Sequence, residues 1–130
     1  MQLHLLTLAA IAAGGGLGAT ARHLLGSAMT RWLGSGFPWG TFAANLLGGL
    51  LMGAVIALLM RFELRDPQLR AFVTTGFLGG FTTFSTFSLE VVLLIERNEH
   101  LLAFLYAVSS VVLCVGAVFM MMSLLRPSVA

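Results

Sequence analysis

Residues 74–88 read TTGFLGGFTTFSTFS, and this stretch decides how the rest of the chain is interpreted. Seven of its fifteen side chains carry a hydroxyl, and three of its residues are glycine. It lies in a run, residues 71–89, that contains no Arg, Lys, Asp or Glu. Polar side chains inside hydrocarbon need partners, and Gly79-Gly80 is a poor helix interior. The pattern therefore favours a membrane helix that breaks near Gly79 to Thr83 and then resumes.

A break inside a membrane is tolerated only where the bared backbone faces protein, water or an ion. Freed carbonyls would suit a cation, and freed N–H groups would suit an anion. The alternative is a continuous packing helix, rich in Gly and Thr, whose hydroxyls bond to its own carbonyls. The spacing of the residues leaves both interpretations open.

The composition places this stretch in a membrane protein. Apolar residues make up 58% of the 130-residue chain and charged residues only 9%, against about 25% in soluble domains. This composition excludes a water-soluble globular protein, which needs a charged surface, and a disordered chain, which needs low hydrophobicity. A net charge of +2, with scattered Arg and no Lys, disfavours nucleic-acid binding.

Four charge-free gaps, each long enough for a helix of about 20 residues, predict four transmembrane helices. We place these helices near 3–26, 39–60, 69–96 and 101–125, in a single domain that covers residues 1–130. A cleaved signal peptide is disfavoured because no basic segment precedes the first span. A β-barrel is disfavoured because the apolar runs are continuous rather than alternating. The expected fold is an all-α integral membrane protein whose third helix is broken in mid-membrane.

The seven Arg give almost no preference for one orientation in the membrane. The side of the N-terminus, the second loop and the C-terminus holds Arg61, Arg65, Arg70 and Arg126, and the other side holds Arg22, Arg31 and Arg97. A chain without bias can insert both ways and form an antiparallel, dual-topology homodimer. The alternative is one fixed topology set by a single Arg or by a partner protein, and the charge count leaves both open.

A few other polar residues fall at membrane depth. Asn45 is inside the second span, Glu90 follows the hydroxyl-rich stretch, and Arg22 closes the first span. Tyr106 and Ser110 are four residues apart and so share one face of the last helix. The first two spans have no mid-span carboxylate, which a proton-coupled cation antiporter would need. Hydroxyl and amide donors without carboxylates favour a path for anions instead.

Glycine pairs four residues apart predict where the helices approach one another closely. The pairs are Gly14/Gly18, Gly49/Gly53 and Gly76/Gly80. Cys114 is a lone thiol in the fourth span, and no cluster of ligating side chains suggests a metal site.

Three segments resemble those of the CrcB/Fluc family of fluoride ion channels. They are residues 79–88 (GGFTTFSTFS), 40–46 (GTFAANL) and 18–22 (GATAR), in the order that this family has. Chain length and span count also fit, so the resemblance covers essentially the whole chain. It implies a dual-topology homodimer with two fluoride pores and a structural sodium ion at the dimer centre.

The resemblance also implies roles for individual residues. Backbone carbonyls of Gly79 and Thr82 would hold the sodium ion. The fluoride pore would be lined by Asn45, Phe84, Phe87, Ser85, Thr86, Tyr106 and Ser110, and Arg22 and Glu90 would belong to its vestibule. The chain departs from the family at three positions: Cys114 and Val118, where hydroxyls are often kept, and His23, which replaces an often aromatic residue.

Together with the resemblance, these observations predict a passive fluoride channel, not an enzyme. It would let cytoplasmic fluoride leave across a bacterial-type inner (plasma) membrane and so protect against fluoride toxicity. Its expected partners are fluoride, sodium as a structural cofactor, the lipid bilayer and a second copy of itself, and no nucleic acid. The alternatives are a small dual-topology cation or drug exporter, which would couple dye uptake to protons, and a non-transporting scaffold subunit, which would give no ion flux.

Overall fold

The computed structural model describes residues 4–127, which form four long helical segments. All four are long and apolar enough to cross a membrane, which confirms the predicted all-α fold with four candidate spans. The segments are α1 (Leu5–Leu33), α2 (Trp39–Arg61), a third segment from Pro67 to Glu96, and α6 (His100–Leu125). The third segment consists of α3 (Pro67–Arg70), η1 (Ala71–Leu78), α4 (Gly79–Phe81) and α5 (Ser85–Glu96).

Local sequence explains where two of these helices end or begin. α1 runs to Leu33, beyond the predicted end at residue 26, because no Gly or Pro follows that residue until Gly34. Gly34 has a φ of 82°, which glycine adopts without strain, and the helix stops there. α3 begins after Asp66, whose carboxylate accepts hydrogen bonds from two backbone N–H groups of the first turn, with Pro67 at the first helical position.

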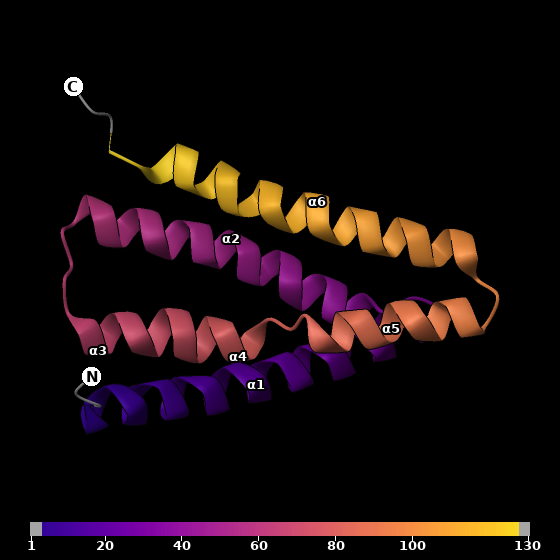
Figure 1. Ribbon diagram of the computed structural model, residues 1–130, viewed down its shortest axis with the longest axis horizontal. Helices are drawn as coiled ribbons and strands as arrows, with labels where there is room; N and C mark the ends of the chain where they lie inside the picture. The colour runs from indigo at the N-terminus through magenta and orange to yellow at the C-terminus, as the bar shows by residue number, and fades with distance from the viewer. Residues whose placement is uncertain (1–3, 128–130) are drawn as a thin grey trace.

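The helices lie as two side-by-side pairs (Figure 1). α1 packs along η1 and α4, and α2 packs along α6. The α2–α3 loop, the start of α1 and the end of α6 lie at one end of the molecule, as expected for an even number of spans. α5 continues beyond the interruption that follows α4 and packs on α6 near the opposite end.

Glycines allow the close approach within each pair. A Cβ on Gly14 or Gly18 would overlap a backbone carbonyl oxygen of η1. Between α2 and α6, a Cβ on Gly53 would lie 2.5 Å from the Val118 carbonyl oxygen. The predicted glycine pairs of α1 and α2 therefore pack helices together within one chain.

The third segment changes its backbone geometry twice. η1 is π-helical, and the Gly79 N–H donates to the Thr74 carbonyl, five residues earlier. Gly79 is itself helical (φ −64°, ψ −37°), and Gly80 packs against the α1 backbone. The chain leaves helical geometry only at Thr82 (φ −88°, ψ 158°). The interruption between α4 and α5, residues 82–84, overlaps the predicted 79–83 but begins three residues later, because packing on α1 outweighs the low helix propensity of the glycines.

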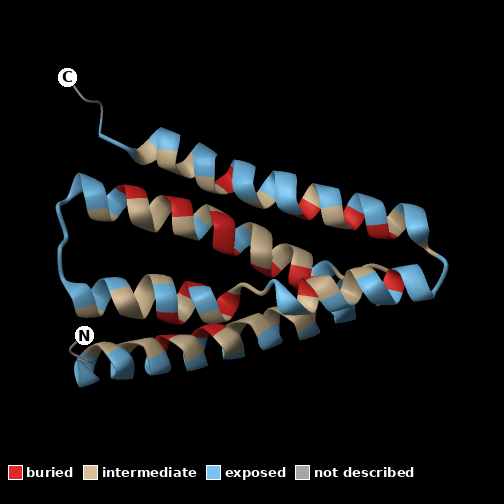
Figure 2. Ribbon diagram, viewed as in Figure 1, coloured by how far each residue is buried: buried red, intermediate tan, exposed pale blue. Residues whose placement is uncertain are grey.

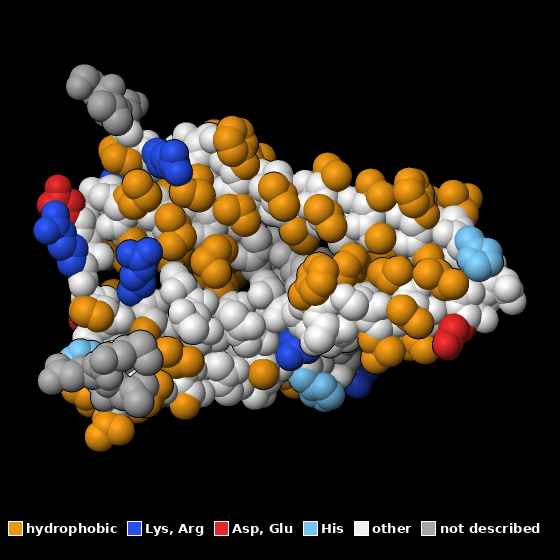
Figure 3. Space-filling model, viewed as in Figure 1, with side chains coloured by type: hydrophobic (Ala, Val, Ile, Leu, Met, Phe, Trp, Pro, Cys, Tyr) orange, Lys and Arg blue, Asp and Glu red, His pale blue; other side chains and the backbone are white. Residues whose placement is uncertain are grey.

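The outer faces of the helices are exposed and apolar. Figure 2 shows that the buried residues lie mainly on faces turned toward neighbouring helices. Hydrophobic side chains such as Leu17, Val112 and Phe119 are more than half exposed, and Figure 3 shows such side chains along most of one face of the molecule. Charged side chains gather at the left end of that view, which holds the α2–α3 loop. An apolar belt with charged ends is typical of a protein surrounded by lipid.

Candidate site around the interrupted helix

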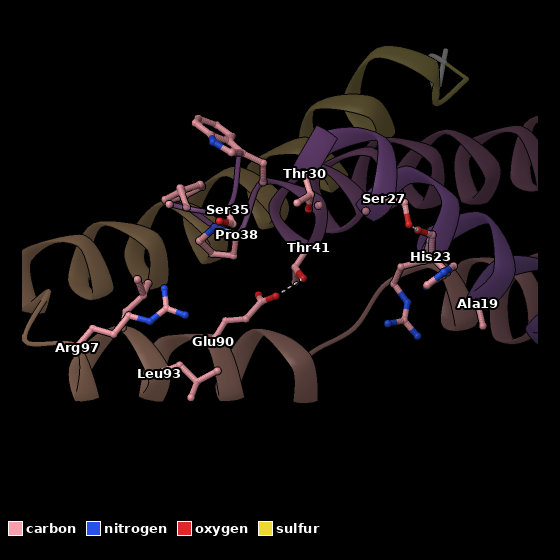
Figure 4. A pocket seen from close by; sticks show the side chains of 17 residues that line it. Ala19, His23, Ser27, Thr30, Ser35, Pro38, Thr41, Glu90, Leu93 and Arg97 are labelled. Atoms are coloured by element: carbon pink, nitrogen blue, oxygen red, sulfur yellow. Dashed lines mark hydrogen bonds between the residues drawn. The ribbon is translucent and has the colours of Figure 1, made fainter. Parts of the chain in front are cut away.

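Two hollows lie on either side of the interruption between α4 and α5. The first, the α1–α5 cavity, has a volume of about 740 Å³ and opens between α1, the start of α2 and α5 (Figure 4). The second, the α2–α6 groove, has about 420 Å³ and runs between α2, the interruption and α6. The α1–α5 cavity has charged walls, whereas the walls of the groove carry only neutral side chains.

The structure divides the predicted site residues between these two hollows. Four predicted pore residues line the α2–α6 groove together: Asn45, Phe84, Phe87 and Ser110. Cys114 and Val118 line the same groove. Arg22 and Glu90, predicted as vestibule residues, line the α1–α5 cavity. Within residues 4–127, neither hollow is lined by Ser85, Thr86 or Tyr106.

A hydrogen-bonded carboxylate lines the α1–α5 cavity. Glu90 accepts hydrogen bonds from Thr41 Oγ1 at 2.8 Å and from the Tyr106 hydroxyl at 2.7 Å, and Figure 4 shows the first of these. Tyr106 is completely buried and meets the Phe87 ring edge-on at 5.2 Å. Since Phe87 lines the groove, the Thr41–Glu90–Tyr106–Phe87 cluster lies between the two hollows.

Asn45 holds the backbone of the interruption. Its Nδ2 donates to the Thr83 carbonyl oxygen at 2.9 Å, and its Oδ1 accepts from the Thr83 N–H at 2.8 Å. These two bonds replace backbone partners that Thr83 would have in a continuous helix. An amide has two N–H donors, so Asn45 has a second one beyond the bond to Thr83.

Two carbonyls of the interrupted segment have no donor among residues 4–127. In a continuous helix, the N–H of Thr83 would donate to the carbonyl oxygen of Gly79, and the N–H of Thr86 would donate to the carbonyl oxygen of Thr82. Here Thr83 donates to Asn45 Oδ1, and Thr86 donates to Thr83 Oγ1 at 3.3 Å. In the part of the chain that the structure describes, no hydrogen bond reaches the carbonyl oxygen of Gly79 or Thr82.

Arg22 of α1 binds the backbone at the end of α4. Its Nε donates to the Gly80 carbonyl oxygen at 3.1 Å, which ties α1 to the end of α4. The rest of the guanidinium group has further N–H donors, and Arg22 also lines the α1–α5 cavity. One side chain therefore fixes the interruption and adds positive charge to the cavity.

The groove combines aromatic rings with an unsatisfied hydroxyl. Phe84 is 74% exposed on the single chain, and its ring lies 5.4 Å from that of the buried Phe87. Ser110 is 95% buried, because only 5% of its surface is accessible, and its Oγ has no hydrogen-bond partner among the described residues. A buried hydroxyl without a partner is costly unless a ligand or water supplies one.

Two residues lie at this site that the sequence analysis named only within a longer segment, Thr41 and Thr83, and not as site residues. Thr41 lies four residues before Asn45, so both point from the same face of α2, and this spacing was the available signal. Thr83 receives both Asn45 bonds and places its hydroxyl 3.2 Å from that of Thr86. Its importance depends on contact with α2, which no local pattern reveals.

A family model described as "CrcB-like protein, Camphor Resistance (CrcB)" matches residues 9–122, which include both hollows and the interruption. The chain belongs to the CrcB family. A relative from Rhodospirillum centenum is 47% identical over 121 residues, which are 93% of this chain and 96% of the relative. A relative from Phenylobacterium zucineum is 52% identical over 110 residues, 84% of this chain and 87% of the relative. Each of these two CrcB-family proteins is named a fluoride-specific ion channel, FluC.

Family membership agrees with the physical character of the helices. Four apolar helices, each long enough to span, make this CrcB-family chain a multi-pass membrane protein. The relatives come from bacteria, and a multi-pass helical protein of this kind belongs to the bacterial plasma membrane. They are named as channels and not as enzymes, in agreement with the predicted absence of catalytic activity.

Proposed function

We propose that this chain is a fluoride-selective channel that lets cytoplasmic fluoride leave passively and so protects the cell against fluoride toxicity. The observation that carries the proposal is the α2–α6 groove, where Asn45, Phe84, Phe87 and Ser110 meet without a charged neighbour. The names of the relatives support fluoride as the permeating ion.

The groove offers what a small anion needs after it loses water. Fluoride holds its hydration shell tightly, so hydrogen-bond donors must offset dehydration. Ser110 Oγ has a donor that no other described residue uses, and Asn45 has a second amide N–H. The edges of the Phe84 and Phe87 rings carry partial positive charge and can face an anion. A cation would find no carboxylate in this groove.

A second copy of the chain, inserted in the opposite orientation, would complete the path. The groove lies open on the single chain, and exposed Phe84 stands at its edge. Gly79 is exposed as well, and no residue between 4 and 127 donates to its carbonyl oxygen. A bare carbonyl facing lipid costs several kcal/mol, on the order of a lost hydrogen bond in hydrocarbon. An antiparallel homodimer would cover both features with the same features of its partner.

A structural sodium ion fits the carbonyls left free at this interface. Two antiparallel copies would bring the Gly79 and Thr82 oxygens of both chains together near the two-fold axis. Neutral oxygens suit a hard monovalent cation, which would take the place of the missing hydrogen-bond donors. Arg22 binds the Gly80 carbonyl, and Asn45 binds the backbone of Thr83. These bonds hold the backbone in a shape in which the proposed ligand carbonyls cannot form helical hydrogen bonds.

The dual topology leads to a prediction about insertion. Adding two or three Lys at one terminus should force most copies into one orientation, because positive residues are retained on the cytoplasmic side. Fluoride flux should then fall. It should return when a copy with Lys added to the first loop, which biases the opposite orientation, is co-expressed. Full transport from a population inserted only one way would exclude the antiparallel dimer.

Liposomes that contain only the purified protein test the function directly. Fluoride trapped inside should flow out when a potassium ionophore balances the charge, and chloride should stay behind under the same conditions. Protein-free liposomes provide the background. A folded, dimeric protein that releases no fluoride would refute the channel and favour the scaffold alternative. Proton-coupled uptake of a cationic dye without fluoride release would favour the small cation or drug exporter.

A further inference from the structure

The α1–α5 cavity carries an excess of positive charge. Arg22 and Arg97 line it, and Glu90 is the carboxylate in its lining. Glu90 is occupied by two hydroxyl donors. Within residues 4–127 the ion pair is Arg65–Glu63, outside this cavity, so neither cavity Arg lies at salt-bridge distance from a carboxylate. Such a cavity attracts anions and raises their local concentration.

His23 adds a charge that depends on pH to the same cavity. It is exposed on α1 next to Arg22, and Figure 4 shows Glu90 between the Arg97 and His23 sides of the cavity. Histidine is the side chain that ordinarily changes charge between pH 5 and 8. Its charged neighbours across the cavity are Glu90 on α5 and Arg97 at the end of α5. The lining residues from α2 are Trp39, Gly40 and Thr41, none of which changes charge in this range.

We propose that the α1–α5 cavity is a pH-tuned entrance for anions, in which protonated His23 raises the local concentration of fluoride and hence the fluoride current. This inference rests on the proposed channel function and goes beyond it, because it assigns a regulatory role to a single side chain. One added charge several ångströms from an anion in a solvated cavity corresponds to about a two- to fivefold gain in occupancy.

Electrical recording in planar bilayers tests the proposal, because hydrogen fluoride is uncharged and carries no current. Fluoride current is measured at low ionic strength, with both sides at about pH 7.5 and then at about pH 5.5. The wild type should conduct about two- to fivefold better at the lower pH. In about 1 M inert salt, where the screening length falls to about 3 Å, the difference should shrink markedly.

Substitutions at His23 separate this side chain from Glu90 as the source of the pH effect. His23→Gln should conduct equally at both pH values, and His23→Arg should conduct at the higher level at both. His100→Gln changes a histidine outside this cavity and should behave as wild type. If pH dependence persists in His23→Gln, or if wild type conducts without pH dependence, the inference is wrong. If no variant conducts fluoride at any pH, the proposed channel function fails instead.

Discussion

Replacing Asn45 with Asp is expected to abolish fluoride conduction while leaving a folded protein. Asp keeps an oxygen that can accept from the Thr83 N–H, but it loses the donor to the Thr83 carbonyl. It also puts a negative charge into a groove that a dehydrated anion should enter. Like-charge repulsion in such a setting costs several kcal/mol. Since each 1.4 kcal/mol or so is tenfold in rate, flux should fall by about a hundredfold or more.

Fluoride efflux from liposomes measures this loss, and gel filtration in detergent checks that the protein remains folded and monodisperse. Asn98→Asp is the matched control, because it makes the same chemical change in the loop before α6, away from the groove. The control should conduct as wild type. Wild-type flux through Asn45→Asp would show that Asn45 does not line the path.

Gly18→Ala should prevent the chain from folding normally. The added methyl group would overlap the Phe77 carbonyl oxygen and approach the Phe81 nitrogen to 2.9 Å. Both neighbours are backbone atoms, so no side-chain rotation can relieve the overlap, and α1 would have to move away from η1. Overpacking of this kind costs roughly 3 kcal/mol or more, and the bond from Arg22 to the end of α4 would be lost with it.

Thermal unfolding followed by circular dichroism, together with the yield of monodisperse protein, measures the effect. Gly16→Ala makes the same change two residues earlier, where an added Cβ has no neighbour within 4 Å. Gly16→Ala should match the wild type or exceed it slightly, since Ala favours helix. Equal stability of the Gly16 and Gly18 variants would mean that α1 does not need to pack so closely on η1.

The sequence alone determined the number of membrane-spanning segments and that they are helical. A bilayer sets a minimum length for an uncharged run, so the gaps between charged residues predicted four spans, and residues 4–127 form four helical segments of that length. The glycine pairs also predicted close helix contacts, because small residues are needed wherever backbones approach each other in lipid. The roles implied by the family for Gly79 and Thr82 remain predictions, although both carbonyls lack donors within residues 4–127.

Only the tertiary structure decided how the polar residues are paired. Asn45 reaches Thr83, 38 residues later, and Glu90 reaches back 49 residues to Thr41. The Tyr106 hydroxyl donates to Glu90, a partner that its own helix does not reveal, and its role in the pore stays a prediction. Periodicity assigns a residue to a face of its own helix, but it does not say which residue of another helix that face meets. That pairing depends on the rotation and depth of each helix, which are set by backbone packing at positions such as Gly18 and Gly53.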